Sequence, residues 1–416
     1  MKVAVIGAGI VGVTTAYELA RQGHSVTVFE RHGSVGEETS FANAGVIAPG
    51  YVTPWAAPGM PWKVLRHLLG RHAPVRLGWP SGAELSWMAS WLKACRTSHF
   101  FANRERMMRL AFYSREQLHE TTARERIEFD RSEGYMVLLR SAKDLALAQN
   151  SLQFLSEAGV THKLLDAAQA LALEPALNPE TALHAAIHVP QDEVGNCRQY
   201  ALLLKQKAEN MGVRFAFNTS LQPLSRSHPT QLLVKGASAA LSHEAVVVCA
   251  GMGSLPLLRP VGVPLPMIAV HGYSVTAAIR NPLDAPRSGL MDERYKVSIS
   301  RLGQRIRVAG SAEVGGSAQK HNPAALGTLY KVLSDWFPGG AKISDNLQIW
   351  KGARPMMPDG PPILGPSGVP GVWLNLGHGS SGWALASGSA KLVSDMVSGR
   401  TPEIDMRGLG IERLRS

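Results

Sequence analysis

The chain has 416 residues, of which 45% are hydrophobic and 18% charged, and its net charge is +11. This is the composition of a soluble globular protein large enough for two domains or one large two-lobed unit. No uninterrupted apolar run reaches about 18 residues, which excludes a transmembrane helix, and we expect no targeting segment. The three cysteines are far apart, without metal-ligand spacing or an even number for disulfides, so we expect no metal site and a cytoplasmic, reducing compartment.

The first 30 residues predict one βαβ unit. Residues 2–6 form an apolar run typical of a buried strand, residues 10–22 have helical periodicity up to Gly23, and residues 25–30 predict a second strand. Further along, residues 51–80 are rich in Pro and Trp and predict irregular structure. Residues 83–95 and 103–126 predict helices, and residues 134–140 and 183–190 predict strands.

The second half of the chain returns to dinucleotide-domain patterns. A helix over 198–211 leads to a strand over 213–218, and residues 244–251 predict another buried strand. Antiparallel strands are expected between 272 and 310, and residues 371–399 predict a strand, a glycine-rich turn and a helix. We therefore predict an α/β fold with a Rossmann-like dinucleotide-binding domain and an inserted α+β substrate domain built on an antiparallel sheet. The predicted dinucleotide-binding domain comprises 1–50, 190–265 and 342–416, and the substrate or cap domain comprises 51–189 and 266–341.

The turn after the first strand carries G-x-G-x-x-G at Gly7, Gly9 and Gly12. The first glycine permits the tight turn, the second lets the backbone approach a pyrophosphate, and the third lets the helix pack on the strand. Glu30 ends the second strand, where its carboxylate can accept hydrogen bonds from a ribose 2′-hydroxyl. A carboxylate there argues against a 2′-phosphate, and hence against NADP.

Two features favour FAD over NAD. Small and polar residues follow Glu30, where an NAD domain would usually continue into a helix, and a second glycine-rich turn, GHGSSGW at 377–383, opens a helix. One turn would serve the pyrophosphate and the other the flavin ring. The candidate cofactor-binding residues are Gly7, Ala8, Gly9, Ile10, Val11, Gly12, Glu30, Arg31, Thr39, Ser40, Asn43, Gly45, Leu221, Ala250, Gly251, Gly377, Gly379 and Gly382.

Several segments together resemble the bacterial D-amino acid dehydrogenases, within the wider D-amino acid oxidase and glycine oxidase class of flavoproteins. They are GAGIVG, ETSFANAGVIAPGY, PWAAPG, TSHF, PQDEVGNC, HGYSVT, GARPMMPDG and LNLGHGSSGW, and they extend over nearly the whole chain. The resemblance implies FAD, oxidative deamination of D-amino acids to 2-oxo acids and ammonia by hydride transfer from Cα, and electron delivery to a respiratory-chain or quinone acceptor. D-proline, hydroxy-D-proline or sarcosine-type dehydrogenases and oxidases on the same scaffold remain alternatives.

The resemblance also implies a role for Arg354, which lies in the stiff segment GARPMMPDG. The arginine of this G-x-R-P segment clamps the substrate carboxylate, a task that suits a planar, bidentate guanidinium. Tyr273 and Tyr295 are the best candidates for pocket tyrosines on strands of the inserted lobe, and His378 lies beside the expected ring site. Each of these three residues fits a structural role equally well.

Basic residues cluster at 63–76, 104–109 and 301–307, and five tryptophans lie between 51 and 101. This pattern suits peripheral association with the cytoplasmic face of the inner membrane, and it also suits a solvated basic surface or a segment packed on the inserted lobe. A nucleic-acid-associated flavoprotein would need basic residues interleaved with stacking aromatics on an added module, and no such module is evident. The intact glycine motifs and Arg354 also argue against a non-catalytic binding subunit.

Overall fold

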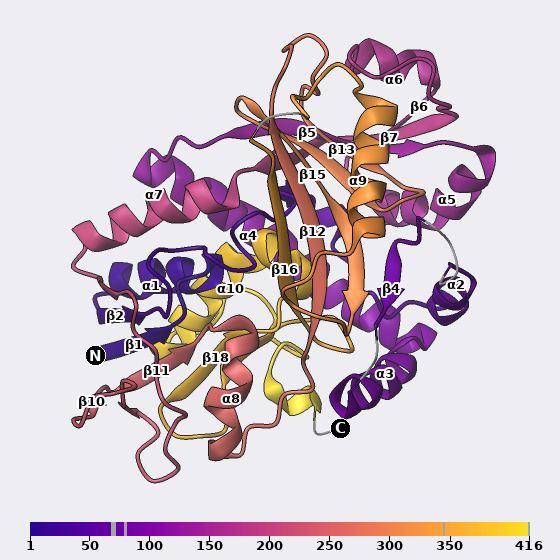
Figure 1. Cartoon of the computed structure of the whole chain (residues 1–416). Coiled ribbons are helices and arrows are strands. Elements are labelled where there is room, and N and C mark those ends of the chain that lie inside the picture. The colour runs from indigo at the N-terminus through magenta and orange to yellow at the C-terminus, as the bar shows by residue number, and fades with distance from the viewer. Residues whose placement is uncertain (68–71, 79–80, 344–345, 415–416) are drawn as a thin grey trace.

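The computed structural model describes residues 1–67, 72–78, 81–343 and 346–414, and within them two sheets organise the chain. Figure 1 shows the smaller sheet at the lower left and the larger one standing to its upper right. The smaller sheet has the strand order β17 (Ile363–Pro366), β18 (Val372–Leu376), β11 (Ala245–Val248), β1 (Lys2–Ile6), β2 (Ser25–Phe29) and β8 (Arg214–Ala216).

The centre of the smaller sheet is parallel. Strand β1 pairs with β2 on one side and β11 on the other, and Ile6 lies opposite both Phe29 and Val248. The carboxyl ends of these three strands therefore meet at one edge, which is where ligands bind in open parallel sheets. Only β17 runs antiparallel, against β18. The near-continuous apolar sequences of β1 and β11 fit strands that are covered on both faces.

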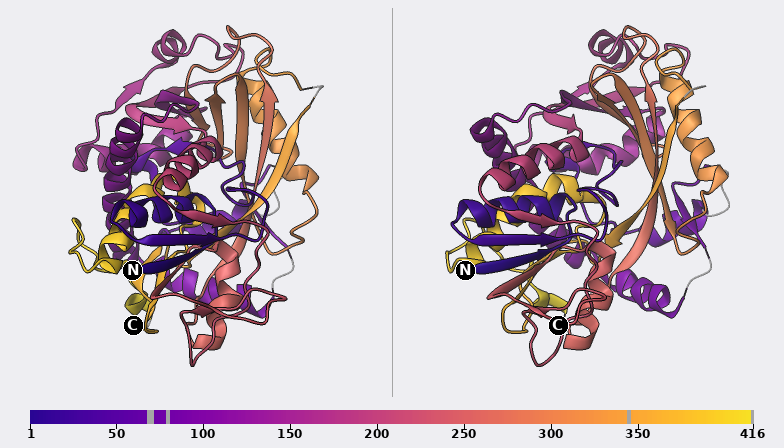
Figure 2. Two further views of the ribbon diagram at one scale, coloured as in Figure 1. Left: turned by 90° about the vertical axis from the view of Figure 1, so that its left-hand side faces the viewer. Right: turned by 60° about the vertical axis from the view of Figure 1, so that its left-hand side comes forward.

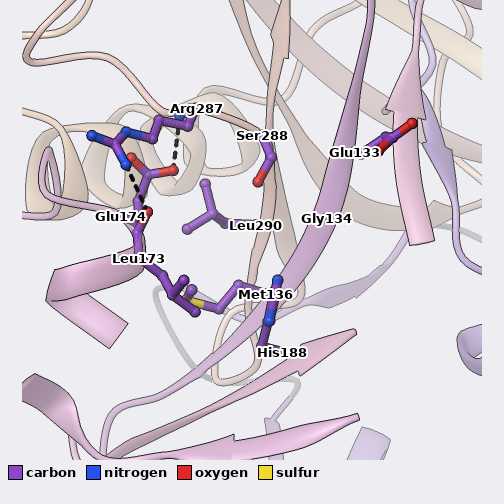
Figure 3. A pocket seen from close by; sticks show the side chains of 9 residues that line it. All are labelled: Glu133, Gly134, Met136, Leu173, Glu174, His188, Arg287, Ser288 and Leu290. Atoms are coloured by element: carbon purple, nitrogen blue, oxygen red, sulfur yellow. Dashed lines mark hydrogen bonds between the residues drawn. The ribbon is translucent and has the colours of Figure 1, made fainter. Parts of the chain in front are cut away.

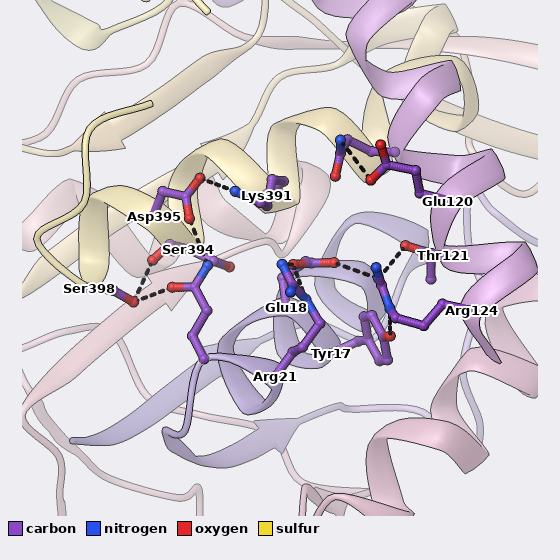
Figure 4. Close-up of polar contacts among 12 residues, drawn as sticks. Tyr17, Glu18, Arg21, Glu120, Thr121, Arg124, Lys391, Ser394, Asp395 and Ser398 are labelled. Atoms are coloured by element: carbon purple, nitrogen blue, oxygen red, sulfur yellow. Dashed lines mark hydrogen bonds and ion pairs between the residues drawn. The ribbon is translucent and has the colours of Figure 1, made fainter. Parts of the chain in front are cut away.

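Helices cover one face of the smaller sheet and bury the largest apolar core of the described chain with it. They are α1 (Ile10–Arg21), α4 (Thr97–Glu125), α7 (Cys197–Asn210) and α10 (Gly382–Val397). Polar contacts join these helices, such as the bond from Gln22 Nε2 to Asp395 Oδ1 at 2.8 Å and that from Tyr17 Oη to Glu125 Oε1 at 2.6 Å. Figure 4 shows Arg124 of α4 beside Tyr17 and Glu18 of α1. The opposite face packs against α8 (Ser254–Leu258), the pair β9 (Gln231–Leu232) and β10 (Leu241–Ser242), and the C-terminal turn.

The larger sheet is mostly antiparallel and has its own helical cover (Figure 2). Its order is β16 (Gln348–Met356), β12 (Ile268–Ala278), β15 (Arg305–Val314), β14 (Val297–Leu302), β13 (Gly289–Asp292), β5 (Arg131–Leu139), β7 (Ala185–Gly195) and β3 (Val46–Ile47), with β4 (Val75–Leu77) beside β15 and β6 (Lys163–Leu165) beside β7. Helix α9 (Pro323–Trp336) packs on one face, which we call the α9 face. The remaining helices are α2 (Met60–His67), α3 (Gly82–Ala94), α5 (Ala142–Glu157) and α6 (Ala167–Leu173).

The predicted fold class is confirmed, and three details differ from the sequence expectations. Residues 51–80 contain α2 and β4 rather than only irregular chain, although 68–71 and 79–80 lie outside the described residues. Strand β16 lies within the region predicted for the FAD-binding domain, yet it is the edge strand of the larger sheet, a position that tolerates Pro355. Helix α4 lies within the predicted cap region, yet it packs on α10 beside the smaller sheet.

Two of the three basic clusters belong to internal contacts rather than to a charged surface. Arg104 is buried with its guanidinium over the ring of Phe154, and Arg307 is buried with its side chain bonded to Thr276 Oγ1 at 2.9 Å. Arg305 pairs with Asp130 at 3.4 Å. These two clusters therefore give little evidence for a charged partner. In the first cluster, Lys63 and Arg66 lie on α2 and Arg76 lies on β4.

Candidate active site

The first glycine-rich turn has the close packing that the motif requires. Gly7 has φ +101°, and a Cβ there would lie 2.9 Å from the carbonyl oxygen of Cys249. A Cβ on Gly12 would lie only 1.9 Å from the carbonyl oxygen of Gly7. A Cβ on Gly9 would meet nothing closer than Ser40 Oγ at 3.4 Å, so this part of the turn is free for a ligand to approach. The turn therefore fits a pyrophosphate at the N-terminus of α1.

Glu30 lies at the end of β2, and both of its carboxylate oxygens are engaged. They accept the backbone N–H of Ala8 at 2.7 Å and that of His32 at 2.8 Å. The carboxylate thus faces the glycine-rich turn, where a ribose next to the pyrophosphate would lie. Arg31 points outward instead and pairs with Glu38. The side chain of Leu221 is buried in the same apolar core as Phe29, so only its backbone could contact a ligand. That backbone also forms a bridge with Val234.

The loop at 39–45 connects the two sheets. Ser40 Oγ accepts the N–H of Ile10 at 3.0 Å, while Thr39 Oγ1 donates to the carbonyl of Ala353 at 2.7 Å, next to Arg354. Three side chains of the larger sheet bind successive carbonyls of this loop: Ser274 binds Ala42 O at 2.7 Å, Arg307 binds Asn43 O at 3.0 Å and Ser300 binds Ala44 O at 2.7 Å. We call this side of the larger sheet the loop face. The predicted residues Thr39, Ser40, Asn43 and Gly45 are thus brought between the glycine-rich turn and Arg354.

The second glycine-rich turn contacts β16, the strand that carries Arg354. Gly377 and Gly379 have φ +79° and +57°, and a Cβ on each would lie 2.9 Å from Met357 Cγ and 2.7 Å from Met356 Sδ, respectively. His378 forms an isolated bridge with Met356, two residues beyond Arg354, and α10 begins at Gly382. Strand β16 also contacts the short turn Gly251–Gly253 after β11. The predicted glycines of the second turn and Gly251 therefore lie around the end of β16.

Arg354 is a cation without an acidic partner among the described residues. Its Nη1 donates to the carbonyl of Ser311 at 3.0 Å, and its guanidinium lies 5.9 Å from the ring centroid of Trp55. Desolvation lowers its pKa to about 10, so it stays charged at neutral pH. Gly272 makes room for it, since a Cβ there would lie 2.2 Å from Nη2. A partly buried guanidinium with most of its donors free is suited to bind a carboxylate.

The two predicted pocket tyrosines do not join Arg354. Tyr273 pairs with Lys351 across β12 and β16, three residues from Arg354, so the period-two alternation of a strand puts it on the opposite face. There it packs against α9, and its hydroxyl bonds to Glu313. Tyr295 lies in the turn between β13 and β14 rather than on a strand, beneath the guanidinium of Arg140 at 5.1 Å. The geometry gives both tyrosines structural contacts, which is the role that their sequence also allowed.

His378 lies near the site but is built into the protein. Its ring is 4% exposed and its Nε2 lies 3.0 Å from Ser389 Oγ of α10. Burial lowers its pKa to about 3, so the imidazole is neutral at physiological pH. It therefore positions the second turn against α10 more readily than it transfers protons.

Three residues at the site were not predicted from the sequence. Trp55 was one of several tryptophans, Ser311 contributes only its carbonyl, and Gly272 is a glycine inside a strand. Of these, Gly272 had a usable signal, because a glycine within a strand often marks a close approach of another group.

Comparison with known proteins shows that the fold has solved relatives and that the chain has a family. The chain is similar in fold to the glycine oxidase of Geobacillus kaustophilus (TM-score 0.75, 20% identity, covering 99% of this chain and 98% of that one) and to the L-proline dehydrogenase of P. horikoshii (TM-score 0.74, 17% identity, 100% and 97%). The family described as FAD dependent oxidoreductase matches residues 2–396, and the chain belongs to it.

Curated relatives are similar over the whole length. The D-amino acid dehydrogenase of Rhizobium johnstonii is 44% identical over 99% of this chain and 100% of its own length, and that of Cereibacter sphaeroides is 43% identical over 99% and 95%.

Proposed function

We propose that this protein is an FAD-dependent D-amino acid dehydrogenase, in which Arg354 binds the carboxylate of the substrate. The observation that carries the proposal is the guanidinium of Arg354, which has no acidic partner among the described residues and lies two residues from Met356, where the second glycine-rich turn bridges β16. The full-length similarity to curated D-amino acid dehydrogenases supports the choice of substrate class. FAD would be held by the turn at Gly7–Gly12, by Glu30 and by the loop at 39–45, and when bound it supplies the hydride acceptor.

In this proposal the chain contributes orientation rather than acid–base catalysis. The planar guanidinium fixes the carboxylate bidentately, which also fixes Cα relative to the loop face. Ser311 and Trp55 hold the guanidinium in place. Neither Tyr273 on the α9 face nor the neutral, buried His378 offers a base there, so the substrate ammonium loses its proton to solvent. The rising limb of kcat/KM with pH should therefore follow the amine pKa when the substrate is changed.

The substrate test is an anaerobic titration of the purified holoenzyme with D- and L-amino acids, D-proline, hydroxy-D-proline and sarcosine. Bleaching of the flavin by primary D-amino acids is expected, and bleaching by secondary amines alone would favour the alternative substrates. The reduced protein is then mixed with oxygen or with a quinone analogue. Faster reoxidation by the quinone supports a dehydrogenase, and fast reoxidation by oxygen would make the protein an oxidase.

Substitution of Arg354 tests the carboxylate site directly. Arg354→Lys keeps the charge without the planar fork and Arg354→Ala removes both, so reduction should slow in that order. Removing one partner of a buried charge pair costs about 3–5 kcal/mol, or roughly 10²–10⁴-fold in kcat/KM. A carboxylate-free amine of similar shape should distinguish the variants much less. Loss of FAD from Arg354→Ala, with normal reduction of any flavin retained, would make the arginine structural.

We also propose that the acceptor is a membrane quinone, reached through peripheral docking on anionic lipid. No helix among the described residues is long and apolar enough to cross a membrane. Large apolar side chains are nevertheless exposed on α2, α3 and the start of α4: Trp62 (73%), Leu65, Leu85, Leu92 and Phe101. We call this set the apolar surface. Glu84 is the only acidic residue between 51 and 101, against six Lys and Arg, so the charge there suits anionic headgroups.

The docking proposal is tested by co-sedimentation with vesicles of phosphatidylglycerol and of phosphatidylcholine. The protein should sediment with the anionic vesicles and be released by high salt. The double change Trp62→Ser and Leu65→Ser should weaken binding, whereas Leu283→Ser, at an equally exposed leucine elsewhere (84%), should not. Equal sedimentation of all three proteins would contradict docking through the apolar surface.

A further inference from the structure

A second cavity lies away from the flavin site, on the α9 side of the larger sheet. It has a volume of about 210 Å³, roughly seven times the ~30 Å³ that one water molecule occupies in the liquid. Figure 3 shows its lining, which comes from β5, β7, the end of α6 and the segment that enters β13. Met136 and Leu290 form its apolar wall and belong to the same core as Tyr273, which places the cavity across the sheet from Arg354.

The pairing of β5 with β7 is irregular beside this cavity. Glu133 lies opposite Glu193 but Tyr135 lies opposite Val189, so the extra residues belong to β7, and the intervening Gly134 of β5 has φ +89°. A Cβ on Gly134 would lie 3.4 Å from His188 Nε2 and 3.6 Å from Ser288 Oγ, so the absent side chain leaves these two polar groups facing open space. Bulges of this kind are concentrated beside functional sites, where they redirect side chains.

The buried end of the cavity holds a carboxylate that is only half satisfied. Glu174 is 2% exposed, and its Oε2 accepts the backbone N–H of Arg287 at 2.8 Å. Its Oε1 has no hydrogen-bond partner among the described residues. A role in holding the chain at Arg287 needs one oxygen only, and leaving a buried acceptor unpaired costs about 1–3 kcal/mol. Burial raises the pKa of this carboxyl, although the backbone N–H groups of Arg287 and Ser288 and the charge of Arg287 act in the opposite direction, and a bound cation would lower the pKa further.

The neighbouring groups define what would satisfy Glu174. The exposed guanidinium of Arg287 makes one long contact, with the carbonyl of Leu173 at 3.4 Å, and lies beside Glu174 in Figure 3. An acid next to a guanidinium matches the adjacent ammonium and carboxylate of an α-amino acid, and Met136, Leu290 and Leu173 would receive a small apolar side chain. We propose that this cavity binds a small α-amino acid as a second ligand, separate from the substrate at Arg354.

The test is equilibrium dialysis of labelled D-alanine and L-alanine against the Arg354→Ala holoenzyme, kept anaerobic. We expect one molecule of at least one enantiomer bound per chain, and two per chain in dithionite-reduced wild type. Adding Glu174→Gln keeps the acceptor for Arg287 but replaces Oε1 with a donor, and should weaken binding at least ten-fold. Leu173→Trp, at the exposed rim, should do the same by obstruction, while the equally exposed Leu164→Trp on β6 should not.

Two results would overturn the second site: no binding of either alanine to the Arg354→Ala holoenzyme, or binding that neither Glu174→Gln nor Leu173→Trp changes. The proposed dehydrogenase activity fails by a different signal, which is a flavin that no D-amino acid bleaches. The two proposals can therefore fail separately.

Discussion

Gly272→Ala tests the site through a residue that contributes no functional group. A Cβ at this position would lie 2.2 Å from Nη2 and 2.4 Å from Cζ of Arg354. Ordinary contact begins near ~3.5 Å, so the guanidinium must move by about 1.3 Å from its present position. A misplacement of about 1 Å in a positioning group can cost roughly 10²-fold, equivalent to about 2.7 kcal/mol. We therefore expect kcat/KM for D-amino acids to fall by about 100-fold with FAD content unchanged.

The assay is steady-state reduction of a dye acceptor, beside FAD content and thermal unfolding. Gly82→Ala is the matched control, because no atom lies within 4 Å of the added Cβ and the backbone is not left-handed. The effect should be absent with a carboxylate-free amine, and it should disappear in the Arg354→Ala background, since coupled residues are not additive. A kcat/KM within about three-fold of wild type would refute the argument, because Arg354 would then not need its present position.

Three further predictions address the cofactor and the buried histidine. Glu30→Gln should weaken FAD binding by about 1.5–3 kcal/mol, measured by fluorescence titration, with turnover at saturating FAD unchanged; the reverse pattern would move Glu30 away from the ribose. FAD should be held non-covalently, because all three cysteines are free and buried, so acid precipitation should leave the yellow colour in the supernatant and not in the pellet. The folded-state pKa of His378 lies near 3, below its unfolded value of about 6.5. Its contribution to the free energy of unfolding is therefore fully present above about pH 6.5 and is lost as the pH falls towards 3. His378→Asn should therefore lose less unfolding free energy than wild type between pH 7.5 and 4.5, by roughly 2–3 kcal/mol, in denaturant titrations.

Local patterns in the sequence predicted the parts of the site that local geometry decides. The turn at Gly7–Gly12 and the carboxylate of Glu30 follow from one βαβ unit, whose residues are close in the chain and in space. The division of the chain was harder to predict, because α4 packs on α10 and β16 pairs with β12, and neither partner is close in the sequence. The exposed leucines of α3 show the same limit: Leu85 and Leu92 have helical spacing, yet it is Trp87 that faces the protein.

The face on which Tyr273 lies depends on the register between β12 and β16, and the sequence of one strand does not reveal that register. HGYSVT reads as a buried strand with apolar and small residues on both sides, so its sequence does not say whether Gly272 or Tyr273 faces the ligand. Pairing with β16 settles it, because Gly272 lies opposite Gly352 and shares a face with Arg354, whereas Tyr273 lies opposite Lys351. A shift of one residue would exchange the two faces. The bulky side chain therefore belongs to the α9 core, and the glycine, which carries no chemistry of its own, is the residue of this strand that lets Arg354 reach the loop face.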